Sequence, residues 1–191
     1  MGKQVILVAS AMIFCVAIAP VYGQYYSETV MARPRVEKMT RLHFFFHDIL
    51  SGTNPAAVPI ARPNITDAGL YLSLIAMDDP LTVGPERTST RIGNAQGLYV
   101  WTCKDPTLFG AVLYTDFAFT SGRFNGSSFS LFSRYPIAEI ATAGEKIIEL
   151  AIVGGRGAFR MARGFALTRA TYVNAMNGDA SLEFNVTLYH Y

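Results

Sequence analysis

A succession of short apolar segments, each followed by a turn signal, runs from residue 41 to the end of the chain and constrains its fold more than any other feature. Eight segments have the length and the β-branched and aromatic content of strands, at residues 42–48, 71–77, 92–102, 108–120, 129–132, 147–153, 165–173 and 180–191. Turn-forming pairs separate them, among them Ser51-Gly52, Asp79-Pro80, Asn125-Gly126, Gly154-Gly155 and Asn177-Gly178. Residues 138–147 could form only a short helical turn, which Gly144 weakens. About eight antiparallel strands in one domain predict an all-β fold, either a closed barrel or a sandwich.

The last segment also predicts which of its side chains point inward. Side chains alternate across a strand, so one face carries Ala180, Leu182, Phe184, Val186 and Leu188. The opposite face carries Ser181, Glu183, Asn185 and Thr187. Because Asn185 is a glycan acceptor, this polar face must be outside, and the apolar face is predicted to point into the interior.

The N-terminus has the features of a secretory signal peptide. Lys3 comes before an apolar run from Gln4 to Ala19, which is shorter than the ~20 residues of a membrane span, and compact residues precede Gly23. We predict that residues 1–23 are removed, that the polar residues 24–40 form a flexible arm, and that residues 41–191 form the domain. The expected destination is the extracellular space, and no second stretch is long and apolar enough to span a membrane.

Cysteine and glycosylation motifs bear on how the secreted chain is stabilised. The chain has 2 cysteines, and Cys15 belongs to the signal peptide, so Cys103 has no intramolecular disulfide partner. We expect Cys103 to be a buried, small apolar residue. Three Asn-x-Ser/Thr motifs predict N-glycosylation, at Asn64, Asn125 and Asn185. Stability must come from core burial, with oligomerisation as a further source.

Composition and charge exclude several classes of function. The formal net charge is +2 and the arginines are scattered, so the chain lacks the clustered basic face that binds nucleic acid. No G-x-S-x-G or H-E-x-x-H signature occurs, and the glycines at 154–157 lack the Lys-Ser/Thr ending of a phosphate loop. We expect no cofactor. The 13 Phe and 10 Tyr residues can instead fill a large core or line a pocket.

The most informative stretch for chemistry is residues 42–48, Leu-His-Phe-Phe-Phe-His-Asp. Strand alternation places Phe44, Phe46 and Asp48 on one face. A carboxyl group at the end of an aromatic face could lie in a partly desolvated pocket mouth, where a raised pKa would let it act as a general acid. Alternatively, Asp48 accepts backbone hydrogen bonds in the turn at Ser51-Gly52, which is the favoured role on this stretch alone.

Two other residue pairs are candidates for a metal site and for an aromatic-ligand site. His43 and His47 share a strand face, but positions i and i+4 lie ~13 Å apart along a strand, too far for one ion. Nothing in the sequence brings His190 near them, so no metal site is expected. Tyr99 and Trp101 also share a face and could stack on an aromatic ligand, although ordinary barrel core is the more common role of such a pair.

Five short motifs occur in the order in which plant dirigent proteins carry them: His47-Asp48-Ile49-Leu50, Asp78-Asp79-Pro80-Leu81-Thr82, Gly93-Asn94-Ala95-Gln96-Gly97-Leu98-Tyr99, Val153-Gly154-Gly155-Arg156-Gly157 and Phe159-Arg160-Met161-Ala162-Arg163-Gly164. Each motif alone is unspecific, but the ordered combination is specific. The chain resembles this family over about residues 41–191.

The resemblance implies an eight-stranded antiparallel β-barrel, usually trimeric with a dimer as the alternative, that is exported to the plant cell wall, or apoplast. Family members have no oxidative machinery of their own. A separate laccase or peroxidase makes phenoxy radicals from a monolignol such as coniferyl alcohol, and the dirigent protein holds two radicals so that they couple with one handedness. The implied partners are thus a small phenolic substrate or radical, an external oxidase and further copies of the chain.

The resemblance also assigns site residues. Asp48 matches the catalytic aspartate of the family, and Tyr99 matches the first of its two pocket tyrosines. Trp101 stands in the place of the second. With these we predict that inward-facing apolar residues of the first and last segments bind the substrate, namely Phe44, Phe46, Leu182 and Phe184.

The chain departs from the pinoresinol-forming subgroup at several of its polar positions. Trp101 removes a hydroxyl group, the loop that carries a second aspartate reads Ser133-Arg134-Tyr135-Pro136, and Ile148 replaces an expected basic residue. The structural disulfide of that subgroup is also missing. The chain is more similar to the diverse subgroup without the disulfide, which includes pterocarpan-forming members and members linked to gossypol-type coupling.

Three functions follow from this sequence. The first is stereoselective coupling of phenoxy radicals supplied by an oxidase. The second is an enzyme of the pterocarpan-synthase type, which dehydrates and cyclises an isoflavanol through a quinone methide, and the third is a non-catalytic binding protein of defence. Glu139, Glu145 or Asp116 could supply a second acid, and the sequence does not select one of them.

Overall fold

The computed structural model describes residues 28–32, 34–64, 71–102, 105, 110–136 and 146–191. The chain divides into two units, Met1–Pro34 and Arg35–Tyr191. The described residues of the first unit are exposed and without regular structure. The predicted signal peptide, both cysteines, the helical turn predicted from residue 138 and the acids at 139 and 145 lie mostly or wholly outside the described residues.

The second unit is built almost entirely of strands. These are β1 (Lys38–Asp48), β2 (Ala57–Ala61), β3 (Leu74–Thr82), β4 (Arg91–Trp101), β5 (Ala111–Phe119), β6 (Ser128–Tyr135), β7 (Ile148–Arg156), β8 (Arg163–Val173) and β9 (Ala180–His190). Two short 3-10 helices, η2 (Gly122–Phe124) and η3 (Gly157–Phe159), lie in the turns after β5 and β7. The predicted N-terminal arm and domain would meet at residue 41, whereas β1 already begins at Lys38.

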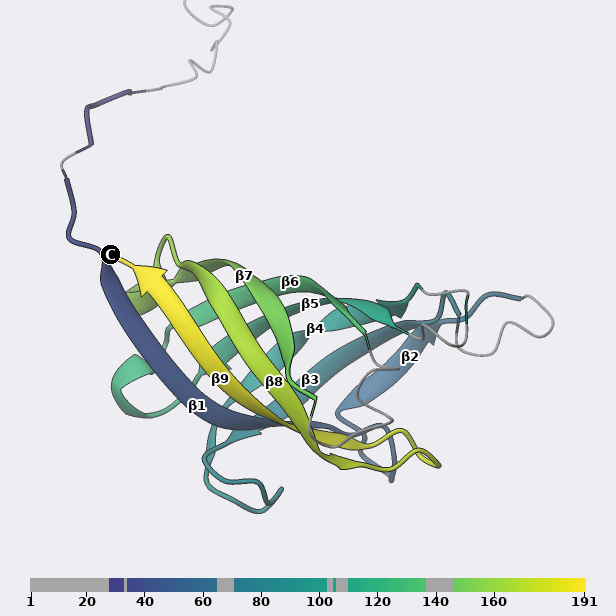
Figure 1. The fold of residues 1–191 in the computed structure, drawn as a ribbon. Helices are drawn as coiled ribbons and strands as arrows, with labels where there is room; N and C mark the ends of the chain where they lie inside the picture. The colour runs from purple at the N-terminus through teal and green to yellow at the C-terminus, as the bar shows by residue number, and fades with distance from the viewer. Residues whose placement is uncertain (1–27, 33, 65–70, 103–104, 106–109, 137–145) are drawn as a thin grey trace, which may run out of the picture. The chain divides into compact units, whose positions relative to one another are not determined.

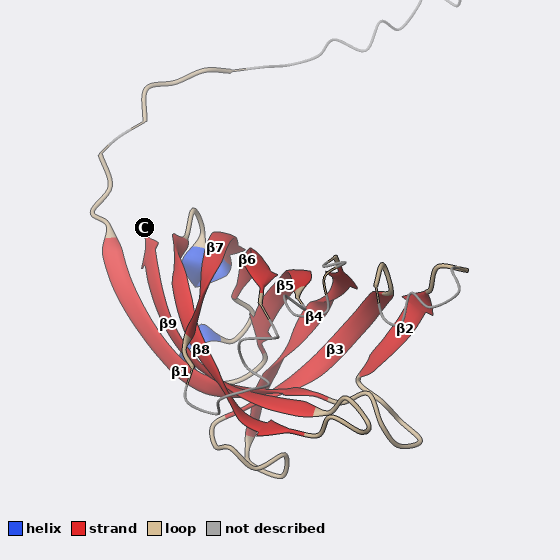
Figure 2. Ribbon diagram, turned by 45° about the vertical axis from the view of Figure 1, so that its right-hand side comes forward, coloured by secondary structure: helices blue, strands red, loops and turns tan. Residues whose placement is uncertain are grey.

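Eight of the nine strands close into an antiparallel barrel (Figure 1). Each strand pairs with its neighbour in the order β1-β9-β8-β7-β6-β5-β4-β3, and β1 pairs again with β3 to complete the ring. The same edge of β3 is shared by two strands, because β2 pairs with its first half and β1 with Leu81 and Thr82. The predicted all-β, eight-stranded antiparallel barrel is confirmed, and β2 is an additional strand that the sequence pattern missed (Figure 2).

Two of the predicted turns are wrong. Asp79-Pro80 lies inside β3, where Pro80 pairs with Asn94 of β4. Along β3, the backbone nitrogen of Pro80 points to the same side as that of Asp78, whose N–H donates to the carbonyl oxygen of Ala56, on the side away from β4. Neither β1 nor β2 pairs with β3 at Pro80 on that side. Its missing N–H therefore breaks no ladder hydrogen bond. Gly154-Gly155 lies inside β7, and the positive φ of that region, +65°, belongs to Gly157 in the turn that follows.

The interior of the barrel is filled in one part by phenylalanine rings. Phe117 stacks on Phe129 with ring centroids 5.0 Å apart, and Phe44 stacks on Phe184 at 5.6 Å. Phe159 from η3 extends this cluster, and all five rings are buried. The inward face predicted for the last segment is confirmed, because its apolar residues from Leu182 to Leu188 are buried at alternate positions.

The three predicted glycan acceptors are accessible. Asn64, Asn125 and Asn185 are all exposed, and Asn185 lies on the outer face of β9 as expected. Their glycosylation stays a prediction. In the part of the chain that the structure describes, no helix has the length and apolar character needed to cross a bilayer.

Candidate functional site

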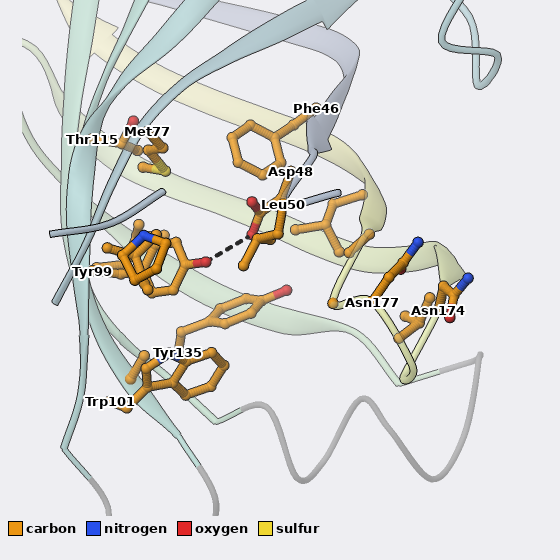
Figure 3. A pocket seen from close by; sticks show the side chains of 18 of the residues that line it. Phe46, Asp48, Leu50, Met77, Tyr99, Trp101, Thr115, Tyr135, Asn174 and Asn177 are labelled. Atoms are coloured by element: carbon orange, nitrogen blue, oxygen red, sulfur yellow. Dashed lines mark hydrogen bonds between the residues drawn. The ribbon is translucent and has the colours of Figure 1, made fainter. Parts of the chain in front are cut away.

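A cavity of about 570 Å³ occupies the part of the barrel that the phenylalanine cluster leaves open (Figure 3). This volume lies within the range of pockets that enclose small organic ligands. Its lining is mostly apolar and comes from β1 to β6, β8 and β9, and Asn174 and Asn177 from the turn between β8 and β9 add amide groups. Arg62, which is exposed and follows β2, also lines it.

The wall formed by β4, β5 and β6 is aromatic at both sides and small in the middle. Tyr99 and Trp101 of β4 meet edge to face with ring centroids 5.6 Å apart. Ala111 of β5 pairs with Trp101 on one side and with Tyr135 of β6 on the other, and all three line the cavity. Such a wall offers ring faces and a shallow recess to a flat aromatic ligand.

Asp48 supplies the carboxyl group of the cavity. It is the last residue of β1, and its Oδ2 atom accepts a hydrogen bond of 3.3 Å from the Tyr99 hydroxyl, whereas its buried Oδ1 atom has no partner among the described residues (Figure 3). Burial raises the pKa of Asp48 to about 7, against the hydrogen bond from Tyr99, which lowers it, and the charge of Asp179 adds to the rise. A carboxyl group with this pKa is protonated in a large fraction of molecules in mildly acidic solution.

The turn that follows β1 is held by a different aspartate. Asp179 Oδ1 accepts hydrogen bonds of 3.0 Å from the backbone N–H groups of Leu50 and Ser51, and its Oδ2 accepts one of 2.7 Å from the Ser51 hydroxyl. Arg87 contributes an ion pair of 3.2 Å. Although burial opposes ionisation, these bonds hold the pKa of Asp179 below its usual range. Because Asp179 accepts the backbone hydrogen bonds of this turn, Asp48 does not have the alternative role of accepting them.

Asp79 is a second buried acid, which the sequence did not identify. It points into the barrel from β3, is fully buried, and neither of its carboxyl oxygens has a hydrogen-bond partner among the described residues. Burial raises its pKa to about 9, the charge of Asp48 adds to the rise, and the nearby backbone N–H of Ile49 offsets part of it. Of the acids proposed from sequence, Asp116 accepts a hydrogen bond of 2.8 Å from Ser130 and alternates with inward-facing neighbours, so it faces outward.

His47, on the outer face of β1, holds the strand that carries Asp48. Its Nδ1 atom lies 2.8 Å from Ser181 Oγ of β9, and its Nε2 atom lies 2.8 Å from Thr82 Oγ1 of β3. Thr82 donates its hydroxyl proton to the carbonyl oxygen of Gly84, so its oxygen accepts from Nε2–H, and Nδ1 in turn accepts from Ser181. Burial, assisted by the charge of Arg87, lowers the pKa of His47 and favours this neutral ring.

The three histidines lie apart from one another. His43 pairs with Glu183 at 2.7 Å on the exposed surface, and His190 lies 2.8 Å from Thr40 near the ends of β1 and β9. Within the described ranges there is no group of three or more histidine, cysteine or acidic side chains that could hold a metal ion.

Most of the residues predicted to bind substrate do line the cavity. Phe46, Tyr99, Trp101, Leu182 and Phe184 lie on its surface together with Asp48. Phe44 does not line the cavity, because its ring is stacked on Phe184 within the buried phenylalanine cluster. Sequence reasoning missed Asp79, Tyr135 and the two asparagines at the mouth, although strand alternation from Phe129 would have placed Tyr135 inward.

Comparison with known proteins gives one consistent family. A family model described as "Dirigent-like protein" matches residues 39–189. Dirigent protein 15 of Arabidopsis thaliana is 47% identical over 193 residues, which cover 99% of this chain and 100% of that protein. Pterocarpan synthase 1 of Glycine max is 45% identical over 159 residues, 82% of each chain.

A solved structure supports the same assignment. The pterocarpan synthase dirigent protein GePTS1 superimposes with a TM-score of 0.75 at 40% sequence identity, over 88% of this chain and 99% of that one. The chain belongs to the dirigent family of proteins.

Proposed function

We propose that this protein dehydrates and cyclises a hydroxylated, phenol-bearing substrate of the isoflavanol type through a quinone methide, without an oxidant. The observation that carries the proposal is the Asp48 carboxyl group, which faces an apolar cavity with its pKa raised to about 7. Similarity to Pterocarpan synthase 1 of Glycine max, at 45% identity, supports this substrate class.

The chemistry needs one proton donor that becomes a base. The protonated Asp48 transfers its proton to the benzylic hydroxyl group, the C–O bond breaks with both electrons leaving on oxygen, and water departs. The substrate is left as a protonated quinone methide. An internal phenol oxygen then attacks the benzylic carbon and loses its proton to the Asp48 carboxylate, which restores the acid. Protons therefore balance over the cycle, and the apolar walls hold the ring-closing atoms close together.

Asp79 assists this cycle from outside the cavity lining. With a pKa near 9, it stays protonated and neutral when Asp48 ionises, so the site carries a single negative charge during the reaction. Two adjacent buried carboxyl groups resist a double negative charge.

Stereoselective coupling of phenoxy radicals is the second candidate function. Its support is the largely apolar, aromatic-walled cavity of about 570 Å³, which has the size for flat phenols and no need of an acid to hold them. In that case a separate laccase or peroxidase supplies the radicals. The third function is ligand binding in defence without catalysis. In that case the raised pKa of Asp48 would serve no purpose.

Replacement of Asp48 tests the proposal. We expect the secreted wild-type protein to convert a 2′-hydroxylated isoflavanol to one enantiomer of a pterocarpan without oxidant, and we expect Asp48→Asn to lower kcat at least about 100-fold. The matched control is Asp78→Asn. Asp78 is exposed, precedes Asp79 on β3 and accepts a hydrogen bond from the Asn94 side chain on the outer face of the barrel. Chiral chromatography of the products measures both rate and handedness.

Two outcomes of this experiment would contradict the proposal. One is full activity of Asp48→Asn. The other is the absence of any product from the isoflavanol, together with an enantiomeric excess when coniferyl alcohol is oxidised by a laccase in the presence of the protein. That second result would assign the radical-coupling function instead.

We also propose that the protein is exported to the apoplast and works there as a homo-oligomer of two or three copies. Support for self-association comes from the outer face of the barrel, where Leu98, Tyr114 and Phe132 are paired in register across β4, β5 and β6 and remain 41%, 43% and 54% exposed. Contiguous exposed apolar residues mark interfaces in secreted proteins. The three glycan acceptors lie outside β4, β5 and β6, the strands that carry this row.

A further inference from the structure

Tyr135 carries a hydroxyl group that the mechanism above does not use. Its side chain lines the cavity at the end of β6, and its Oη atom is buried without a hydrogen-bond partner among the described residues. Figure 3 shows this hydroxyl pointing away from the strand and into the cavity. Burial, and then the charge of Asp48, raise the pKa of Tyr135, so the hydroxyl keeps its proton.

A buried hydroxyl group without a partner is uncommon in folded proteins and calls for an explanation. A core packing role would not require the oxygen atom, since phenylalanine would fill the same space. The Tyr135 ring lines the cavity wall and its hydroxyl points into the cavity, so a ligand that packs against the ring brings its own polar atoms next to this oxygen. Its partner is therefore expected to come from the ligand.

The neighbours of Tyr135 indicate which part of a ligand it meets. Ala111 lies in register between Tyr135 and Trp101, and this small residue leaves a recess between two large aromatic side chains. A flat ring that packs on Trp101 over Ala111 would present a ring substituent to the Tyr135 hydroxyl. Tyr99 cannot serve the same purpose as freely, because its hydroxyl donates to Asp48.

We propose that Tyr135 binds the phenolic oxygen of the ligand, whose ring packs against Trp101 over Ala111. Trp101 has no hydroxyl to offer, so Tyr135 supplies from two strands away a second hydroxyl beside that of Tyr99. Asp48 faces the benzylic hydroxyl group of the ligand and Tyr135 faces its phenolic oxygen, so the two residues together select aromatic ligands with a free phenol. The inference rests on the proposed function only in taking the ligand to be a phenol that occupies this cavity.

The chain offers a direct optical readout of this contact. Trp101 is its single tryptophan, so fluorescence excited selectively at the indole reports on the cavity. Two flat probes that cannot be dehydrated, 7-hydroxyisoflavone and unsubstituted isoflavone, differ only in the phenolic hydroxyl. Both are titrated into the full-length protein, its Tyr135→Phe variant and a Tyr172→Phe control, in which the hydroxyl is removed from an exposed tyrosine of β8 that does not line the cavity.

We expect Tyr135→Phe to weaken the binding of 7-hydroxyisoflavone about five- to tenfold. The affinity for isoflavone should stay within about twofold, which also shows that the variant is folded, and Tyr172→Phe should match the wild type with both probes. Equal weakening of both probes, no weakening of either, or failure of the wild-type protein to bind 7-hydroxyisoflavone would overturn the inference.

This result is separable from that of the proposed function. Hydroxyl-dependent binding without turnover of an isoflavanol would keep the Tyr135 contact and remove the cyclase proposal. Turnover of the isoflavanol by the wild-type protein, together with normal binding of both probes by the Tyr135→Phe variant, would keep the cyclase proposal and remove the Tyr135 contact.

Discussion

Two buried carboxyl groups, those of Asp48 and Asp79, set the response of the protein to pH. Their pKa values are raised from 3.8 to about 7 and about 9, chiefly by burial. The folded chain thus holds these protons more tightly than the unfolded chain. The stabilisation is fully present below pH 3.8 and is lost as the pH rises toward 7 for Asp48 and toward 9 for Asp79, at up to about 1.4 kcal/mol per pH unit and group.

Replacement of Asp79 by asparagine tests this linkage. The Asp79→Asn variant has no buried proton to lose, so its Tm should rise relative to that of the wild type as the pH increases from 4 to 8. Thermal unfolding followed across that range measures the difference. Asp78→Asn, one residue away and exposed, removes only the smallest contribution to the raised pKa of Asp79 and should keep most of the wild-type pH dependence. If the Tm curves of Asp79→Asn and the wild type ran parallel, Asp79 would not be protonated in the folded protein.

At the scale of strands, the barrel closes through a short contact that His47 reinforces. Only two residue pairs, Phe45 with Thr82 and Phe46 with Leu81, connect β1 to β3. His47 bridges the same strands through Thr82 and adds Ser181 of β9, which fixes the end of β1 where Asp48 begins the turn. The position of the acid in the cavity thus depends on a side chain on the other face of its strand.

We expect His47→Ala to lower the free energy of unfolding by roughly 2–4 kcal/mol, because it leaves a void and two buried hydroxyl groups without their partner. The control is His43→Ala on the same strand face, where the side chain is 49% exposed and pairs with Glu183. That change should cost less than about 1 kcal/mol. Urea denaturation compares the two, and equal losses would show that His47 does not brace the closure.

Local patterns predicted the strands well and the long-range contacts poorly. Side chains alternate between the two faces of β1 and β9, and this pattern depends on neighbouring residues alone. The inward orientation of Phe46, Leu182 and Phe184 could therefore be predicted from the sequence. Asp79-Pro80 has the composition of a turn, and only the sharing of the β3 edge between β1 and β2 makes a strand possible there.

The same distinction explains the site. The raised pKa of Asp48 comes chiefly from burial inside the barrel, and Asp179, which is far from it in sequence, adds its charge and holds the turn. Alternation along β6 would have placed Tyr135 inward, whereas Asp79 belongs to a segment predicted as a turn, so its inward side chain could not be predicted.

At the scale of the whole molecule, self-association should depend on the row formed by Leu98, Tyr114 and Phe132. We expect light scattering after gel filtration to give a dimer or trimer for the wild type and a lower mass for Phe132→Glu, because a buried, unpaired charge is costly at an interface. Val83→Glu is the matched control, since Val83 is also 54% exposed but lies in the loop after β3. A monomeric wild type, or an oligomer that survives Phe132→Glu, would contradict this assignment.

If the protonated carboxyl group of Asp48 performs acid catalysis inside the barrel, as we propose, the reaction rate must depend on pH. The most direct test is the initial rate of isoflavanol consumption by the wild-type protein, without oxidant, between pH 5 and 9. Turnover should be highest at acidic pH and fall as the pH rises through about 7, where Asp48 loses its proton. No consumption at any pH, or a rate that increases through this range, would contradict it.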